Sequence, residues 1–296
     1  MAQEKWLIEH GPKTIETGAI STLKVGLING RIDIVGHDEP GARIEIHSVS
    51  GKDLKVSIDG DTLEIDHPQF GWDNLLDSLK RFTGKASAEV SLHVPRNVAL
   101  KFGVVTAGGL ISGLTGDVSA NTVSGELVID GLRGALALNS VSGELAVRDH
   151  IGTVTARTIG GDVTVGGQID RLVVDSVGGN VFADLLGSAD ELRVNTVGGN
   201  VTVRMPAGLP VQYKISTAVG KVQLDDTSYA GVRGQFTARH GQLDQHWLDF
   251  KANTVGGDIT ALHAARSEDS GAAATSPDAP SQAASGTATD SPVAQP

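Results

Sequence analysis

The 296-residue chain contains no cysteine, which excludes disulfides, thiolate metal ligands and cysteine nucleophiles together. Aromatic residues make up only 4% of the chain although 40% of it is hydrophobic, so valine, leucine, isoleucine and alanine must fill a core. The net charge of −11 is not offset by any basic stretch, which argues against binding to a nucleic-acid backbone. No segment reaches the roughly 18 consecutive apolar residues that a membrane span needs.

The first residues, MAQEKWLIEHGPK, lack the apolar core of a secretory signal and carry Glu4 and Glu9 where such a signal is hydrophobic. We therefore expect a cytoplasmic protein without a transmembrane span. Peripheral association with a membrane stays open as an alternative.

Proline is also missing from a long internal stretch, because none occurs between Arg96 and Met205. Proline cannot donate a hydrogen bond to a strand ladder, so a long valine-rich stretch without it favours continuous β-pairing.

One short phrase recurs within this stretch. TVSGEL, at residues 122–127, returns as SVSGEL, TIGGDV, SVGGNV and TVGGNV, and the apolar residues between the copies alternate as they do in strands. A repeat of about 18 residues cannot bury its own apolar side, but stacked copies can. The sequence therefore predicts an all-β, single-domain β-solenoid in which each phrase marks the same corner. Its second-glycine anchors are read as Gly109, Gly125, Gly143, Gly161, Gly179, Gly199, Gly220, Gly241 and Gly257 in that order.

The pattern divides the chain into four parts. Residues 1–14 are a lead-in, residues 15–100 an irregular β segment that caps the solenoid, and residues 101–264 the stacked repeats. Residues 265–296, rich in Ala, Ser, Pro and Asp, are expected to be a disordered acidic tail. Within the repeats, the apolar residue of each corner is expected in a shared narrow interior, as for Val141, Ile159, Val177 and Val197.

A helical insertion is predicted at residues 70–82, where apolar residues fall at helical spacing. Two roles are open for this helix. It caps one end of the solenoid, or it docks a protein partner or a membrane surface. The residues that would make the contact are Phe70, Trp72, Leu75, Leu76, Leu79 and Phe82.

The residue after each anchor glycine forms a column that includes three carboxylates, Glu126, Glu144 and Asp162. Stacked carboxylates repel one another, and a cation such as Ca²⁺ would relieve the repulsion. A solvated ladder of turn residues is the alternative, so these three are metal candidates only, and we predict no cofactor. His240, Asp244, His246 and Trp247 lie close in sequence but lack the spacing that places two imidazoles on one face, so they are interpreted as surface turn residues.

The phrase SGELVIDGLRGALALNSVSGELAV, with LKVGLINGRIDIVGHD and GDTLEID before it, resembles a bacterial family of "putative adhesin" or "toastrack" domains over roughly residues 15–262. The resemblance implies a β-solenoid and a setting in cell-envelope or stress functions, and it brings no catalytic residues. We expect a non-catalytic scaffold that binds an unknown protein partner or a membrane-surface component, with self-association also open. The alternative is a β-helix enzyme or ligand-binding protein that acts on carbohydrate, with calcium as its cofactor.

Overall fold

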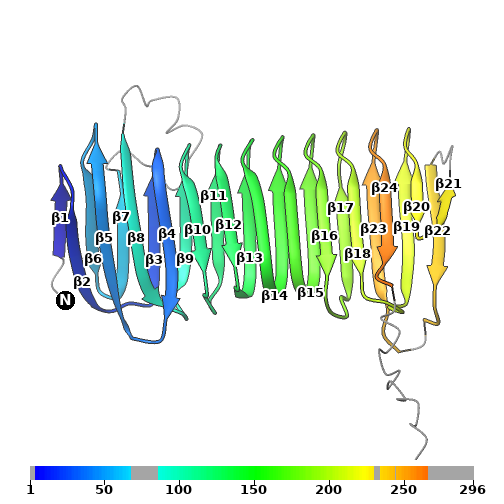
Figure 1. Ribbon diagram of the computed structural model, residues 1–296, viewed down its shortest axis with the longest axis horizontal. Helices are drawn as coiled ribbons and strands as arrows, with labels where there is room; N and C mark the ends of the chain where they lie inside the picture. Colours follow the sequence, from blue (N-terminus) through cyan, green and yellow to red (C-terminus); the bar gives the residue numbers. More distant parts are fainter. Residues whose placement is uncertain (1–3, 68–85, 230–233, 244, 266–296) are drawn as a thin grey trace, which may run out of the picture. The chain divides into compact units, whose positions relative to one another are not determined.

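The computed structural model describes residues 4–67, 86–229, 234–243 and 245–265. These residues are all-β, with 24 strands and no helix, which confirms the predicted class (Figure 1). Accordingly, the part of the chain that is described contains no helix able to cross a membrane. The predicted helix at 70–82 lies outside the described residues. The chain divides into two units, residues 1–264 and 265–296, and all the strands belong to the first.

The first ten strands precede the repeated phrase: β1 (Glu4–Ile8), β2 (Lys13–Ala19), β3 (Thr22–Leu27), β4 (Gly30–His37), β5 (Gly41–Ser50), β6 (Leu54–Asp59), β7 (Thr62–Asp66), β8 (Ser87–Pro95), β9 (Ala99–Val104) and β10 (Gly108–Ser112). The next eight cover the repeats: β11 (Val118–Thr122), β12 (Glu126–Asp130), β13 (Arg133–Ser140), β14 (Glu144–Thr158), β15 (Val163–Ser176), β16 (Val181–Leu185), β17 (Glu191–Asn195) and β18 (Val201–Met205). The last six are β19 (Val211–Thr217), β20 (Val222–Leu224), β21 (Thr227–Tyr229), β22 (Gly234–His240), β23 (Leu248–Thr254) and β24 (Ile259–His263).

The strands pair in two long rows. One row runs β1, β6, β7, β3, β9, β11, β13, β14, β15, β17, β23, β19, β22. The other runs β2, β5, β8, β4, β10, β12, β14, β15, β16, β18, β24, β20, β21. β14 and β15 are long enough to contribute to both rows. Buried side chains from the two rows share one hydrophobic core.

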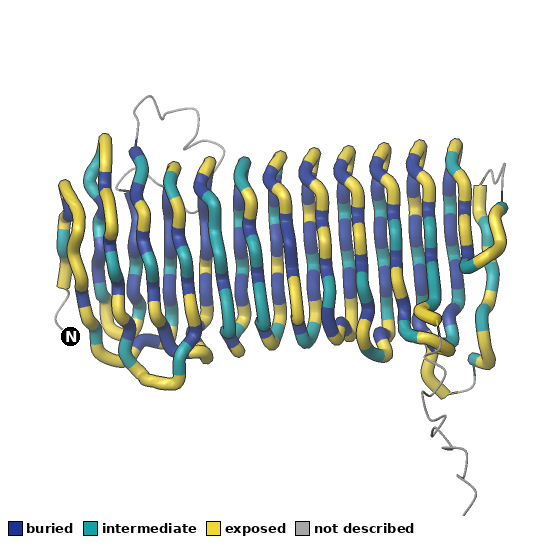
Figure 2. Tube along the Cα trace, in the orientation of Figure 1, coloured by how far each residue is buried: buried dark blue, intermediate teal, exposed yellow. Residues whose placement is uncertain are grey.

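In the middle of the molecule each strand pairs in parallel with the equivalent strand of the next repeat. Leu127 pairs with Leu145, Leu145 with Val163, and Val163 with Val181, and all four side chains are buried. Buried and exposed residues alternate along these strands, as Figure 2 shows. Identical positions of successive repeats therefore lie in files, about 4.8 Å apart.

The strand order departs from the chain order at the C-terminal end. β23 lies between β17 and β19, and β24 lies between β18 and β20, so the last repeat is inserted between two earlier ones. The predicted order of the last anchor glycines is therefore wrong: Gly257 follows Gly199, and Gly220 follows Gly257. Gly109 and Gly241 are not anchors: Gly109 pairs with Leu127, two residues past the anchor Gly125, and Gly241 lies in the loop after β22 beside Pro210. Sequence spacing counts residues along the chain and does not register such an insertion.

The two ends of the rows are built differently from the middle. At the N-terminal end β1 pairs with β6, and β2 with β5, both antiparallel. At the other end β22 pairs with β19, and β21 with β20, again antiparallel. These hairpin-like additions cover the strand edges that a purely parallel stack would leave open.

Candidate functional site

The repeated phrase forms a corner held by its first and fourth residues. In one corner the backbone N–H of Gly161 donates to Oγ1 of Thr158 at 3.1 Å. The same bond forms at four further corners, Ser140–Gly143, Ser176–Gly179, Thr196–Gly199 and Thr254–Gly257, whereas Oγ1 of Thr217, which opens the corner of Val219, has no hydrogen-bond partner among the described residues. The opening Ser or Thr is buried in each of the corners that form this bond, so its hydroxyl satisfies a backbone donor that water does not reach.

The second glycine of the phrase is required by close stacking. A Cβ added at Gly161 would lie 1.9 Å from the carbonyl oxygen of Gly143, and one at Gly179 would lie 2.0 Å from that of Gly161. A Cβ on the first glycine, Gly160, would be 3.7 Å from its nearest neighbour, which is an ordinary contact. The phrase thus repeats because each corner lies directly on the backbone of the one before it.

The three carboxylates proposed as metal candidates lie in one exposed file, but the structure does not bring them together as a ligand set. Glu126 pairs with Glu144 across neighbouring strands, and Oδ1 of Asp162 accepts from the backbone N–H of Asn180 at 2.7 Å. The three do not form a group whose ligand atoms all lie within 4.8 Å of one another.

Beyond Asp162 the same file continues as a ladder of hydrogen bonds. Asn200 donates its backbone N–H to Oδ1 of Asn180 at 3.1 Å, Asp258 donates to Asn200 at 3.0 Å, and Lys221 donates to Asp258 at 2.8 Å. Each side chain therefore accepts from the backbone of the next repeat. This use of a carboxylate or amide oxygen is structural, which favours the solvated-ladder interpretation of the file.

The apolar residue of each corner does not enter the core. The expectation for Ile159, Val177 and Val197 is wrong, because their exposed fractions are 57%, 50% and 50%, and Val141 is only half-buried. The chain turns at this position, directly after the buried Ser or Thr, so the alternation of the strand does not carry through the corner. Val255 is equally exposed at 54%, and Val219 reaches 74%.

These exposed side chains form a continuous file. Gly178 donates its N–H to the carbonyl of Ile159, Gly198 to that of Val177, Gly256 to that of Val197, and Val219 to that of Val255, at 2.8–2.9 Å. Their corners are therefore stacked in this order. We call the exposed file the corner ridge and define it as Ile159, Val177, Val197, Val255 and Val219.

Polar files flank the corner ridge on both sides. On one side Asn195 donates to Asp175, and Asn253 donates to Asn195, both through the side-chain amide at 2.8 Å. On the other side runs the ladder from Asp162 to Lys221. An apolar strip with a polar border is the usual composition of a protein-binding surface.

A second candidate lies at the C-terminal end, where Asp225, His240 and His263 meet. Nδ1 of His263 lies 3.0 Å from Oδ2 of Asp225, and Nδ1 of His240 lies 3.7 Å from the same oxygen. The two imidazole rings stack, with centroids 3.9 Å apart and planes 22° apart. We call these three residues the His–Asp cluster.

The electrostatics of the His–Asp cluster centre on Asp225. Partial burial alone would raise the pKa of this carboxyl. Hydrogen bonds from the backbone and the side chain of His263, together with the charges of His263 and His240, outweigh that effect and lower its pKa below the ordinary value. Asp225 therefore acts as an acceptor for groups that converge on it.

Sequence reasoning found only one member of this cluster. It grouped His240 with His246, which instead lies 3.5 Å from Asp190. Asp225 and His263 join His240 because β20 pairs with β24 while β22 pairs with β19. No spacing in the sequence reports these pairings, so no local signal could have identified the set.

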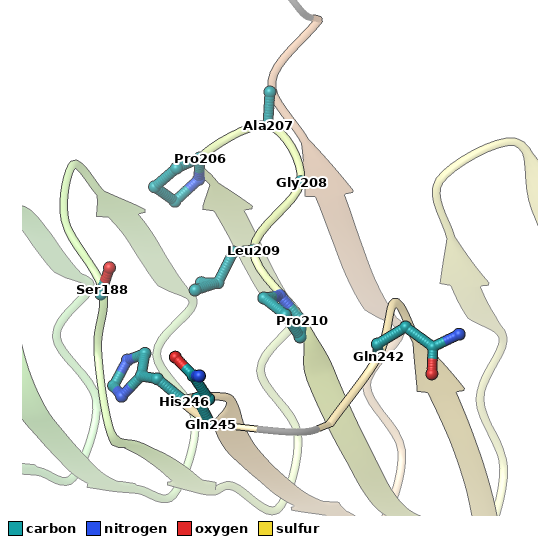
Figure 3. A pocket seen from close by; sticks show the side chains of 9 residues that line it. All are labelled: Ser188, Pro206, Ala207, Gly208, Leu209, Pro210, Gln242, Gln245 and His246. Atoms are coloured by element: carbon teal, nitrogen blue, oxygen red, sulfur yellow. The ribbon is translucent and has the colours of Figure 1, made fainter.

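A surface pocket of about 570 Å³ adjoins the cluster. In Figure 3 the loop that carries Pro206 and Pro210 lies across from Gln245 and His246. Leu209 lines the pocket, and its carbonyl lies 3.1 Å from Nε2 of His263, which connects the two features. The pocket is open and of mixed polarity, and we assign it no ligand.

Comparison with known proteins gives a likeness in fold only. No family model matches the sequence, and no curated protein matches it. A solved structure named "putative lipid binding protein", from Parabacteroides distasonis, aligns with a TM-score of 0.50 and 12% identity over 85% of this chain and 96% of that one. Another, named "putative cell adhesion protein", from Clostridium sporogenes, aligns over 89% of this chain and 99% of that one at 15% identity. Its TM-score of 0.30 is too low to support an argument.

Proposed function

We propose that the protein is a non-catalytic interaction scaffold, a β-solenoid of stacked repeats that binds another protein surface through its corner ridge. The observation that carries the proposal is the file of five exposed β-branched side chains on consecutive corners. A contiguous exposed apolar strip with a polar border is a common form of contact surface for a partner.

The corner ridge suits docking because its shape is fixed before a partner arrives. Valine and isoleucine have few side-chain rotamers, so they lose little conformational entropy on binding. Four of the five corners beneath them are held by buried hydroxyl–glycine hydrogen bonds, and all five by the close stacking of glycines. Five corners at about 4.8 Å each give a rigid strip about 19 Å long.

The occupant that we propose is a second copy of this chain, packed antiparallel. Val197 is the middle member of the ridge, so an antiparallel copy places Val197 on Val197 and brings Lys221 opposite Asp162 of the other copy. The two end residues of the ladder, Asp162 and Lys221, carry opposite charges. The antiparallel arrangement therefore forms two Lys221–Asp162 pairs between the copies, one at each end.

The adhesin-like role and the cell-envelope setting are parts of this proposal that rest on the sequence resemblance. The cytoplasmic or membrane-peripheral location stays a separate expectation from the sequence. The alternative of a calcium-dependent carbohydrate enzyme is less well supported. Its expected ligands, Glu126, Glu144 and Asp162, do not converge, and Asp162 is already engaged with Asn180.

Sedimentation equilibrium of the full chain at several concentrations tests the proposal. We expect a monomer–dimer equilibrium in the wild type, and Val177→Asp with Val197→Asp should abolish the dimer because both charges would be buried in the interface. Phe182→Asp and Leu186→Asp are the matched controls, since these exposed apolar residues lie outside the ridge. A wild type that is strictly monomeric, or controls that disrupt the dimer equally, would overturn the proposal.

The charge pairing has its own test. Lys221→Glu should weaken the dimer, and adding Asp162→Lys should restore it, because the exchange recreates opposite charges across an antiparallel interface. If the double variant is no tighter than Lys221→Glu alone, the antiparallel arrangement is wrong.

A further inference from the structure

We propose that the His–Asp cluster is a binding site for one divalent metal ion of the zinc class. Nδ1 of His240, Nδ1 of His263 and a carboxylate oxygen of Asp225 would be its protein ligands. This inference is independent of the corner ridge, because it rests on different residues at a different place in the molecule.

The backbone positions the three ligands from three separate segments. Asp225 follows β20 in a tight turn, and its N–H donates to the carbonyl of Ala261 at 2.8 Å. His263 ends β24, and its own N–H donates to Oδ1 of Asp225 at 2.7 Å. His240 ends β22, which is held in register by β19. Each ligand is thus anchored by the ends of paired strands, which are more rigid than free loops.

The distances suit a first-row metal. Zinc binds imidazole nitrogen and carboxylate oxygen at about 2.0–2.2 Å, so two ligand atoms in a tetrahedral site lie about 3.4 Å apart. Here Oδ2 of Asp225 lies 3.0 Å from Nδ1 of His263 and 3.7 Å from Nδ1 of His240. All three ligand atoms lie within 4.8 Å of one another, and no other such trio occurs among the residues with described placement.

The outer hydrogen bond of His263 provides a second, independent observation. Its Nε2 faces the carbonyl of Leu209 at 3.1 Å, and a carbonyl only accepts, so Nε2 carries a proton. Without an ion Nδ1 donates a proton to Asp225; a bound ion would replace that proton, and Nδ1 of the neutral ring would then present its lone pair to the ion. A histidine fixed through one nitrogen by a backbone carbonyl is the usual arrangement around a metal ligand. The side chain of His263 is only 8% exposed, so this geometry is shielded from water.

The stacking of His240 on His263 places a second imidazole beside the carboxylate of Asp225. The nearly parallel rings have centroids 3.9 Å apart, and Nδ1 of His240 lies 3.7 Å from the oxygen that Nδ1 of His263 also faces. Two imidazoles and one carboxylate are a donor set that suits zinc, and they leave a fourth position for water or another ligand.

A bound ion would hold the inserted repeat in place. Its ligands come from the turn after β20, the end of β22 and the end of β24, so one ion would join the terminal hairpins to the repeat inserted beside them. Binding of an ion to the folded form only would stabilise this end of the molecule.

Calorimetric titration of zinc chloride into the full chain, freed of any affinity tag, tests the proposal. We expect one ion per chain, and His240→Ala should weaken binding by at least about tenfold because it removes a ligand. His246→Ala is the matched control, since this exposed histidine lies beside Asp190 and outside the cluster. Absence of binding in the wild type, or equal loss in both variants, would overturn the proposal.

The visible absorption of bound Co²⁺ reports direct coordination, and it does not change when a variant affects only the stability of the fold. Co²⁺ in place of zinc should give visible absorption bands typical of nitrogen and oxygen ligands in the wild type, and Asp225→Asn should alter or abolish them. Circular dichroism of each variant checks that it is folded. A spectrum identical to that of free Co²⁺ in the folded wild type would contradict the site.

Discussion

The middle of the molecule and its two ends follow different rules. In the middle, each strand pairs in parallel with its equivalent in the next repeat, and glycines, hydroxyls and amides form files. At the ends the pairing becomes antiparallel, and the chain inserts its last repeat between two earlier ones. The regular middle provides the extended surface, whereas the irregular C-terminal end brings together residues from distant segments. Repetition thus provides rigidity, and its interruption provides a localised cluster of side chains.

The largest effect is expected at a corner of the middle. Gly161→Ala should lower the free energy of unfolding by about 3 kcal/mol, because its Cβ would lie 1.9 Å from the backbone of Gly143 and the repeats would have to move apart. Gly160→Ala, one residue earlier, should change it by no more than about 0.5 kcal/mol. Urea unfolding of both variants measures the difference. Equal effects at the two glycines would contradict the close stacking of the corners.

At the N-terminal end, the buried His67 should make the free energy of unfolding depend on pH. Burial, with a smaller effect of Lys52, lowers the pKa of His67 from 6.5 to about 4. The folded protein therefore keeps this ring neutral while the unfolded chain binds a proton below pH 6.5, so acid favours unfolding. Between pH 7 and pH 5 the free energy of unfolding should fall by about 2 kcal/mol from this group.

Urea unfolding at the two pH values, in the wild type and in His67→Leu, isolates that contribution. The variant should lose the His67 part of the pH dependence and retain the rest. Burial also lowers the pKa of His150, in the middle of the molecule, so part of the dependence should remain. If the free energy of unfolding of His67→Leu fell with pH as steeply as that of the wild type, the pKa of His67 would not be lowered in the folded protein.

The smallest effect concerns the hydroxyl of a corner. Thr158→Val keeps the shape of the side chain but leaves the buried N–H of Gly161 without its acceptor, at a cost of about 1 kcal/mol. Thr164→Val, on the exposed side of β15, is the control and should be nearly neutral. Thermal unfolding of the two variants measures the difference in stability. A neutral Thr158→Val would mean that the hydroxyl is not needed to hold the corner.

The sequence was sufficient for the features that depend on local repetition. Alternation of apolar residues predicted the all-β class, and the recurring phrase located the corners at Gly125, Gly143, Gly161, Gly179 and Gly199. It was not sufficient for the direction of side chains within the corner. Val177 and Val197 look like core residues in a period of two, but the turn rotates them outward. Their neighbours in sequence, a Ser or Thr before and a glycine after, do not indicate that the side chain points outward.

The candidate sites were mostly beyond the reach of sequence. The predicted carboxylate column exists as a file, but the hydrogen bond from Asn180 to Asp162 depends on register between repeats. The His–Asp cluster depends on the insertion of β23 and β24, since only this order brings His263 to Asp225. The predicted contact residues at 70–82 lie outside the described residues and stay a prediction.

The order of the repeats at the C-terminal end is the claim on which the His–Asp cluster depends, and engineered disulfides test it directly because the chain has no cysteine of its own. Asn253 pairs with Asn195 on one side and with Ser216 on the other. Neighbouring strands lie about 4.8 Å apart and permit a disulfide, whereas strands two steps apart lie beyond its reach of about 7 Å. Asn195→Cys with Asn253→Cys should therefore cross-link under mild oxidation, while Asn195→Cys with Ser216→Cys should not. Cross-linking of the second pair and not the first would mean that the repeats stack in simple chain order, which would contradict the inserted repeat.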